Sequence, residues 1–245
     1  MNMNITKHKE EYVVEKDGEQ LAKIETYRNP YHLSNCYINF DSDSIVGIGD
    51  TNIFQIIADE EKRPLQAMLS SLETQKAIFL ASQGFKKVRI CHEMEVKKKD
   101  LLSTLPSQES DISKANRGQD EYKDCCELLF KYYKDTHEPI NPLSSTFDVF
   151  IELMPAEVFY ARGNDDIQHV AFVNDNEISY VGSRDEITFD SFALAVVNEL
   201  FKDNQSIVFE ADNVDWAAMV LKNLFLTDST ETFDTWIYKK YVISK

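Results

Sequence analysis

Apolar and polar positions follow the same order near the end of each half of this 245-residue chain. Residues 65–85 read as an apolar strand, a Ser-rich cap, an amphipathic helix and a Gly-Phe ending. Residues 206–225 read as the strand SIVFEAD, an amphipathic helix and a Leu-Phe ending. Each copy is followed by a further predicted strand, 86–96 or 233–243. The repeated strand–helix–strand pattern predicts two copies of one fold.

The N-terminal half begins with a predicted hairpin. Its alternating residues surround Asp17-Gly18, a dipeptide typical of tight turns. Ser70 and Glu73 have the spacing of a capping box and predict the start of the helix that ends at Gly84. The other expected elements are a strand over 35–41, a loop over 41–52 and a short helix over 53–61.

The C-terminal half predicts helix, strands, helix, strand, helix and strand in that order. Its first helix has one apolar face, made of Tyr122, Cys125, Cys126, Leu129, Tyr132 and Tyr133. Strands are expected over 145–154, 156–163, 168–175 and 177–183. Apolar residues at helical spacing over 189–201 give the clearest helix of the chain. Asp212 and Asp215 are placed to act as the cap and a first-turn carboxylate of the next helix.

Between the halves lies a stretch that is poor in apolar residues and rich in turn formers. We therefore expect a domain over 1–98, a linker over 99–118 and a second domain over 119–245.

Composition is that of an ordinary globular protein, with 43% apolar and 28% charged residues. The sequence has no apolar run of membrane-spanning length, and MNMNITKHKEEY lacks the apolar core of a signal peptide, so we expect a cytoplasmic protein without a membrane segment. The four cysteines favour buried free thiols. The five histidines and four cysteines show no metal-binding spacing, so no metal site is expected.

Negative charge is concentrated in the second half. Residues 1–98 hold 13 Lys/Arg against 15 Asp/Glu, whereas residues 99–245 hold 13 against 27. Such a field argues against nucleic acid as a partner, because binding phosphates needs clustered cations. The negative charge suits a small-molecule amine or a basic partner. It is equally well explained as a charge that keeps the protein soluble.

The order of elements resembles the GNAT superfamily of N-acetyltransferases. The resemblance rests on 63–96, with its strand, helix, Gly84-Phe85 and following strand, and on 177–241, which has the same succession. It implies an α+β fold of two GNAT-like (acyl-CoA N-acyltransferase) domains with mixed, largely antiparallel sheets, the N-terminal domain being incomplete. It also implies transfer of an acetyl group from acetyl-CoA to an amine.

In this family two neighbouring parallel strands separate, and the cofactor's pyrophosphate rests on amides at the start of the next helix. The resemblance assigns this role to Val181, Gly182, Ser183 and Arg184. Here two carboxylates, at positions 185 and 186, follow the arginine and oppose a pyrophosphate. In the N-terminal half the corresponding loop reads VGIGDT, over 46–51, and has no basic residue.

The family's catalytic groups are also incompletely matched. Many members place a tyrosine about four residues before the Gly-Phe ending, where it protonates the leaving thiolate. The matching positions are Leu80 in the first copy and Val220 or Leu221 in the second, so no hydroxyl is present there.

Glu210 and Glu152 are the candidates for the base that deprotonates the amine. Each is predicted on an otherwise apolar strand, where desolvation would raise the carboxyl pKa toward neutrality. The alternative is that each simply points to solvent at an alternate strand position.

Two functions therefore stay open. One is an N-acetyltransferase that uses acetyl-CoA on an unknown amine. The other is a catalytically inactive GNAT-like protein that binds a small molecule or a partner protein, or that forms a homodimer. The weak phosphate loop favours the second function.

Overall fold

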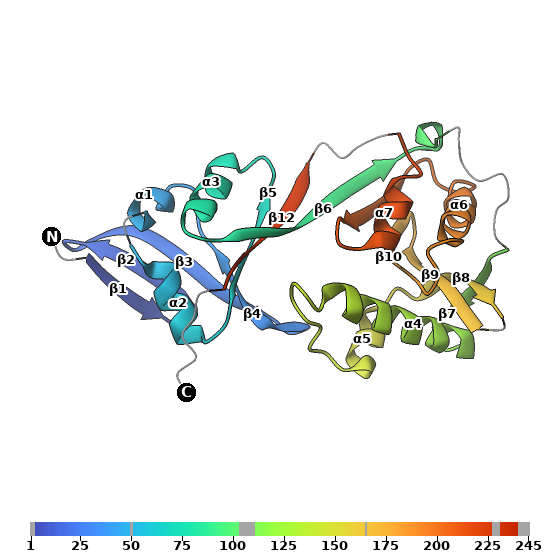
Figure 1. Ribbon diagram of the computed structural model, residues 1–245, viewed down its shortest axis with the longest axis horizontal. Helices are drawn as coiled ribbons and strands as arrows, with labels where there is room; N and C mark the ends of the chain where they lie inside the picture. The colour runs from blue at the N-terminus through green and yellow to red at the C-terminus, as the bar shows by residue number, and fades with distance from the viewer. Residues whose placement is uncertain (1–2, 50, 103–110, 165, 227–230, 240–245) are drawn as a thin grey trace. The chain divides into compact units, whose positions relative to one another are not determined.

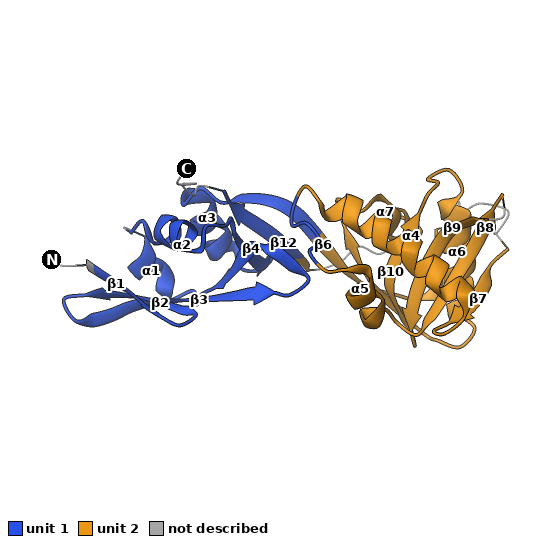
Figure 2. Cartoon of the chain, turned by 90° about the horizontal axis from the view of Figure 1, so that it is seen from below, with its two compact units in different colours: residues 1–90, 140–144, 233–245 blue, residues 91–139, 145–232 orange. Residues whose placement is uncertain are grey.

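The computed structural model describes residues 3–49, 51–102, 111–164, 166–226 and 231–239. The chain forms two compact units, neither of them continuous in sequence (Figure 2). Unit 1 contains residues 1–90, 140–144 and 233–245, and unit 2 contains residues 91–139 and 145–232.

Unit 1 combines a mostly antiparallel sheet with three helices (Figure 1). Its strands are β1 Met3–His8, β2 Glu11–Lys16, β3 Glu19–Asn29, β4 His32–Asn39, β5 Leu65–Ser70, the first part of β6 Lys86–Val96, and β12 Thr232–Tyr238. Its helices are α1 Ser44–Ile48, α2 Ile53–Glu61 and α3 Thr74–Ser82. The strand order is β1-β2-β3-β4-β5-β12-β6, so the last strand of the chain lies between β5 and β6.

The hairpin expected at Asp17-Gly18 is confirmed. It joins β2 to β3, and both turn residues have positive φ, 52° for Asp17 and 90° for Gly18. Two consecutive positive φ values match the right-handed twist of the paired strands. The strand over 35–41 and the helix over 53–61 are also present, as β4 and α2.

The loop expected over 41–52 contains a helix instead, α1. Gly47 lies in it, and a Cβ atom added there would come within 2.6 Å of the Leu21 Cβ. The missing side chain therefore lets α1 pack directly on β3. This close approach explains the glycine at position 47.

Unit 2 places helices on both faces of its sheet region: α4 and α5 cover one face, and α6 and α7 cover the other (Figure 1). Its strands are the second part of β6, β7 Ser113–Asn116, β8 Glu157–Gly163, β9 Asp166–Asn174, β10 Glu177–Ser183 and β11 Ile207–Asp212. Its helices are the 3₁₀ turn Lys98–Asp100, α4 Asp120–His137, α5 Phe147–Leu153, α6 Phe189–Leu200 and α7 Trp216–Lys222. The strand order is β6-β11-β10-β9-β8-β7.

The strand expected over 145–154 is wrong, because this segment forms helix α5. Thr146 has extended backbone and precedes the helix as its N-cap, and Asp148 lies in the first turn. Phe150 is buried, with its ring centroid 5.2 Å from that of Phe130 on α4. A short apolar run does not by itself distinguish a strand from a buried helix, and packing against α4 decided the outcome.

The other helices of unit 2 follow the sequence closely. The predicted apolar face of α4 is buried except for Tyr133, which is half-buried, and α6 is the expected helix after 189. At α7 the N-cap is Asp215, whose carboxylate accepts a hydrogen bond from the Ala218 amide. Asp212, expected as the cap, is the last residue of β11 instead.

The units differ from the expected ranges 1–98 and 119–245 at several places. Residues 140–144 and 233–245 belong to unit 1, because β12 pairs with β5 over six residues and Ser144 donates its amide to the Tyr31 carbonyl at 2.7 Å. The expected linker 99–118 contains β7, which pairs with β8, while its residues 103–110 lie outside the described part.

Candidate functional site

Each unit contains one parallel strand pair that separates after a short contact. In unit 2, β10 and β11 pair only at Glu177 with Val208 and at Ile178 with Phe209. In unit 1, β4 and β5 pair only at Cys36 with Leu65 and at Tyr37 with Gln66. Beyond these residues each pair of strands diverges. Backbone groups that leave a ladder need other partners, so the two splits are the natural places to look for a ligand.

In unit 2 the end of the split is filled by Tyr132 from α4. The Tyr132 ring lies beside Gly182 on β10, where an added Cβ would come within 3.3 Å of it. Its hydroxyl donates to the Asp215 carboxylate at 2.5 Å and accepts from the Ala217 amide at 3.1 Å, both just after β11. Tyr132 therefore joins the end of β10 to the start of α7, and its side chain occupies the space between them.

The expected cofactor residues lie at the end of β10. Val181 and Ser183 are buried, and Gly182 faces α4. Ser183 is held through its hydroxyl by the His169 ring nitrogen at 2.7 Å. Arg184 is exposed and lies 3.7 Å from the Asp166 carboxylate, which partly offsets its charge.

A carboxylate of the chain itself occupies the loop before α6. Asp185 accepts hydrogen bonds from the Ile187 amide at 3.1 Å, the Thr188 hydroxyl at 2.6 Å and the Gln168 side-chain amide at 3.0 Å. The bonds from Thr188, first of all, and from Ile187 lower the pKa of Asp185. Asp185 thus places a negative charge, held by three donors, in the loop directly before α6.

His169 on β9 also holds this loop, through both nitrogens of its ring. Its second ring nitrogen lies 2.9 Å from the Thr188 hydroxyl, and its ring stacks on Phe192. His169 is buried, and this burial lowers its pKa. A neutral imidazole therefore connects both ends of the loop, through Ser183 and Thr188.

The split of unit 1 ends against aromatic side chains. Phe40, which follows β4, lies 5.9 Å from Phe54 on α2 and 6.1 Å from Phe79 on α3, measured between ring centroids. All three are buried. The segment between β4 and α1 carries Asp41 and Asp43, whose negative charges would repel a phosphate.

The two expected catalytic carboxylates lie apart and are exposed. Glu210 is on β11, opposite Glu93 of β6, with the Cys91 thiol 3.6 Å from its carboxylate. Glu152 is on α5 rather than on a strand, with a side chain that is 79% exposed and 3.5 Å from Arg117. Neither carboxylate lies in the apolar surroundings expected for it. The sequence did not indicate that Tyr132 and Asp215 are hydrogen-bond partners, because no local pattern links residues so far apart in the chain.

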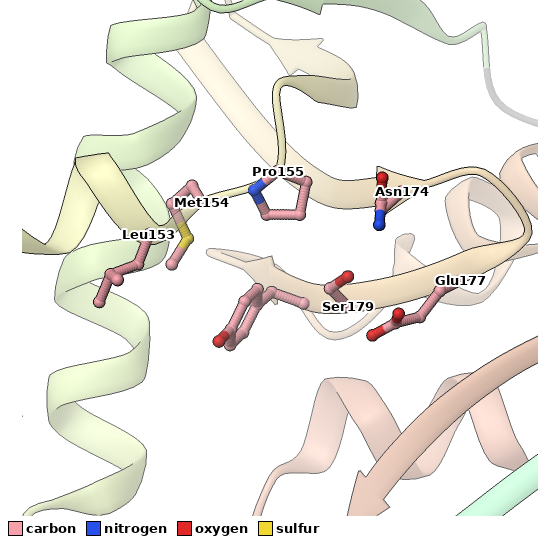
Figure 3. Close-up of a pocket in the computed structure, with 7 residues that line it drawn as sticks. Leu153, Met154, Pro155, Asn174, Glu177 and Ser179 are labelled. Atoms are coloured by element: carbon pink, nitrogen blue, oxygen red, sulfur yellow. The ribbon is translucent and has the colours of Figure 1, made fainter. Parts of the chain in front are cut away.

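Unit 2 also contains an open pocket of about 370 Å³ (Figure 3). One wall is the end of α5, with Leu153, Met154 and Pro155, and the other is the β9–β10 hairpin. The hairpin contributes Asn174, Glu177, Ser179 and Tyr180. Among the described residues that line this pocket, Glu177 is the charged one.

Other site classes receive no support within the described residues. No group of His, Cys, Asp and Glu there is arranged to hold a metal ion. All four cysteines are buried thiols that form no disulfide, as expected. No described helix is long and apolar enough to cross a membrane.

No protein-family model matches the sequence, and no curated protein matches it. Solved structures do match the fold. The GCN5-related N-acetyltransferase of Sphaerobacter thermophilus aligns with TM-score 0.52 and 13% identity, over 94% of this chain and 80% of that protein. The GCN5-related N-acetyltransferase of Kribbella flavida aligns with TM-score 0.51 and 15% identity, over 97% and 90%.

A tandem GNAT protein from the clavulanic acid biosynthesis pathway is also similar, with TM-score 0.50 and 10% identity, over 93% of this chain and 82% of that one. Its tandem organisation agrees with the two units described above. The chain therefore has the α+β fold of the GNAT N-acetyltransferases, in a two-domain arrangement.

Proposed function

We propose that this chain is a catalytically inactive GNAT-like protein that binds a small molecule. The observation that carries the proposal is the Asp185 carboxylate, which accepts the hydrogen bonds of the loop where the fold would hold a pyrophosphate. The position of Tyr132 supports it, since this side chain lies between Gly182 of β10 and the start of α7, at the end of the split where the fold would hold a pantetheine arm.

The negative charge of the loop before α6 also supports an inactive protein. A pyrophosphate at this loop would meet the carboxylates of Asp185 and Glu186, with Arg184 next to them in the sequence as a compensating charge. Like charges this close to each other repel, which opposes binding of the pyrophosphate. Displacing Asp185 would also take from the Ile187 amide and the Thr188 hydroxyl the acceptor of their hydrogen bonds, which has a cost in free energy.

A second candidate is an N-acetyltransferase that transfers acetyl from acetyl-CoA to a small amine. The observation that favours it is the separation of β10 from β11 after two residue pairs, together with the similarity to solved acetyltransferases. This function requires the Tyr132 side chain to leave the split and Asp185 to turn away from the loop.

Cofactor binding separates the two candidates. We expect 1 mM acetyl-CoA or CoA to leave the melting temperature of the full chain unchanged. A ligand with a Kd tenfold below its concentration would add about 1.4 kcal/mol and raise the melting temperature by roughly 3 °C or more. Release of CoA thiol in the presence of acetyl-CoA and an amine mixture is measured in parallel. A clear thermal shift, or any amine-dependent CoA release, would refute the inactive assignment.

We further propose that unit 1 is the incomplete GNAT-like domain and serves as a scaffold. In support of this, its first four strands, β1 to β4, follow one another with no helix between them. Unit 2 instead has α4 and α5 between β7 and the next strand, β8.

A further inference from the structure

We propose that the pocket between the end of α5 and the β9–β10 hairpin binds a small organic monocation, an amine carried on an apolar body (Figure 3). This inference rests on the proposed binding function and assigns it a site and a ligand class. The ammonium group would lie at Glu177, and the apolar body would lie against Leu153 and Met154.

The apolar wall of the pocket is held in place from α4 and the residues before it. The Arg117 guanidinium donates a hydrogen bond to the Met154 carbonyl, and the Arg117 backbone amide donates to the Ala156 carbonyl at 2.8 Å. The Tyr122 hydroxyl donates to the Pro155 carbonyl at 2.9 Å. Three consecutive carbonyls are therefore fixed, and the wall needs little ordering when a ligand binds.

The polar wall is fixed as well. The β9–β10 turn is closed by Asp175, with φ 54°, and the side-chain amide of Asn176 donates to the Ser206 carbonyl at 3.1 Å. The register of β10 against β9 shifts between Ile178 and Tyr180, which leaves Ser179 at a bulge. Glu177 and Ser179 line the same pocket, as alternate residues of one strand do, and Tyr180 lines it as well.

The chemistry of the lining selects the ligand class. The polar side chains beside Glu177 are neutral, and no lysine or arginine lines the pocket, so an anion is disfavoured and a cation is favoured. The opposite wall continues onto the exposed face of α5, where Val149 is 46% exposed and Leu153 is 44% exposed. A volume of about 370 Å³ lies at the small end of the range for small-molecule sites.

The test compares three ligands of one shape on the full chain: phenethylamine, which is protonated at pH 7, neutral 2-phenylethanol and anionic phenylacetate. Binding is followed by backbone amide chemical shifts and by calorimetry. We expect phenethylamine to bind with a Kd of roughly 1 mM, as befits a ligand of this size. We expect its shifts to centre on Met154, Asn174 and Ser179, and the other two ligands to bind about 10-fold more weakly or worse.

Two variants and a matched control sharpen the result. Glu177→Gln keeps the shape of the side chain and should weaken phenethylamine about 10-fold or more. Leu153→Ala should weaken it about threefold, through lost apolar contact. Glu127→Gln removes another exposed carboxylate of unit 2, one that does not line the pocket, and should change nothing. Equal binding of the neutral ligand, shifts centred elsewhere, or an unaffected Glu177→Gln variant would each overturn the proposal.

The outcomes also separate this inference from the proposed function. Absence of amine binding without any effect of acetyl-CoA would remove the pocket assignment and leave the inactive assignment standing. Binding of phenethylamine at the pocket together with its acetylation by acetyl-CoA would keep the pocket and remove the inactive assignment.

Discussion

The Tyr132 phenol donates a hydrogen bond to the Asp215 carboxylate, with 2.5 Å between the oxygens. The same phenol accepts a hydrogen bond from the Ala217 amide at 3.1 Å. Burial raises the pKa of both side chains, so the phenol keeps its proton and serves as the donor. A single side chain thus ties α4 to the first turn of α7 and closes the end of the β10–β11 split.

Replacing Tyr132 with Phe should destabilise the protein by about 2–3 kcal/mol. The variant loses a bond to a charged acceptor and leaves the Ala217 amide and the Asp215 carboxylate with one partner fewer in a buried site. The free energy of unfolding is measured by urea denaturation. Tyr27→Phe is the control, because Tyr27 is 46% exposed and keeps its ring stacked on Tyr37. A loss no larger than that of the control would contradict the assigned role.

Asp215→Asn should make the protein relatively more stable as the pH rises. The folded pKa of Asp215 lies above its unfolded value, mainly because of burial. The native state therefore holds the proton longer than the unfolded state, and wild-type stability falls as the pH rises from the unfolded pKa through the raised folded pKa. The asparagine variant lacks this loss and can still accept from Ala218.

The measurement for Asp215 is urea denaturation of both proteins at a series of pH values from 3.5 upward. The difference between variant and wild type should grow in favour of the variant across that window. A difference that is constant with pH, or that grows in favour of wild type, would show that the folded pKa is not raised.

Asp185→Asn gives the opposite pH dependence. Hydrogen bonds from Thr188 and Ile187 lower the folded pKa of Asp185, so its stabilising effect is present above the unfolded pKa and is lost as the pH falls through the folded one. Wild type should therefore lose stability in acid more than the variant does. Parallel acid-unfolding curves for the two proteins would argue against a carboxylate held by this loop.

Gly47→Ala should destabilise unit 1 by about 1–3 kcal/mol, the usual effect of overpacking. The new methyl group would meet the Leu21 Cβ at 2.6 Å and the Leu21 carbonyl oxygen at 2.7 Å. Since alanine keeps both atoms, adding Leu21→Ala should not restore stability. Urea denaturation of the single and double variants checks this, and a rescue by the second substitution would place the contact elsewhere.

Cleavage within 103–110 should leave one folded species. Unit 1 contains β12, which pairs with β5 through six residues from Phe233↔Ser70 to Tyr238↔Leu65 and supplies Trp236 and Tyr238 to its core. A protease site placed there and cut under native conditions should give a single peak in size-exclusion chromatography, and two peaks in urea. Residues 1–98 expressed alone should lack native-like circular dichroism. Two separate folded fragments in native buffer would contradict this.

Much of the fold is determined locally and could be predicted from the sequence. The Asp17-Gly18 turn, the apolar face of α4 and the helix α6 each depend on residues within a few positions of one another. The resemblance to the GNAT fold rests on the same local order of strands and helices. Where the local signal was ambiguous, as in the apolar run that became α5, the prediction was wrong because contact with Phe130 decides the structure.

The candidate site depends on contacts between distant segments, and only the tertiary structure decided it. Nothing near Tyr132 in the sequence indicates that its hydroxyl reaches Asp215, and nothing near β5 indicates that β12 becomes its neighbour. The sequence by itself determined that acidic residues stand where a phosphate loop is expected. The folded chain decided that Asp185 accepts that loop's hydrogen bonds, because the positions of the Thr188 and Gln168 donors are set by the packing of α6 and β9.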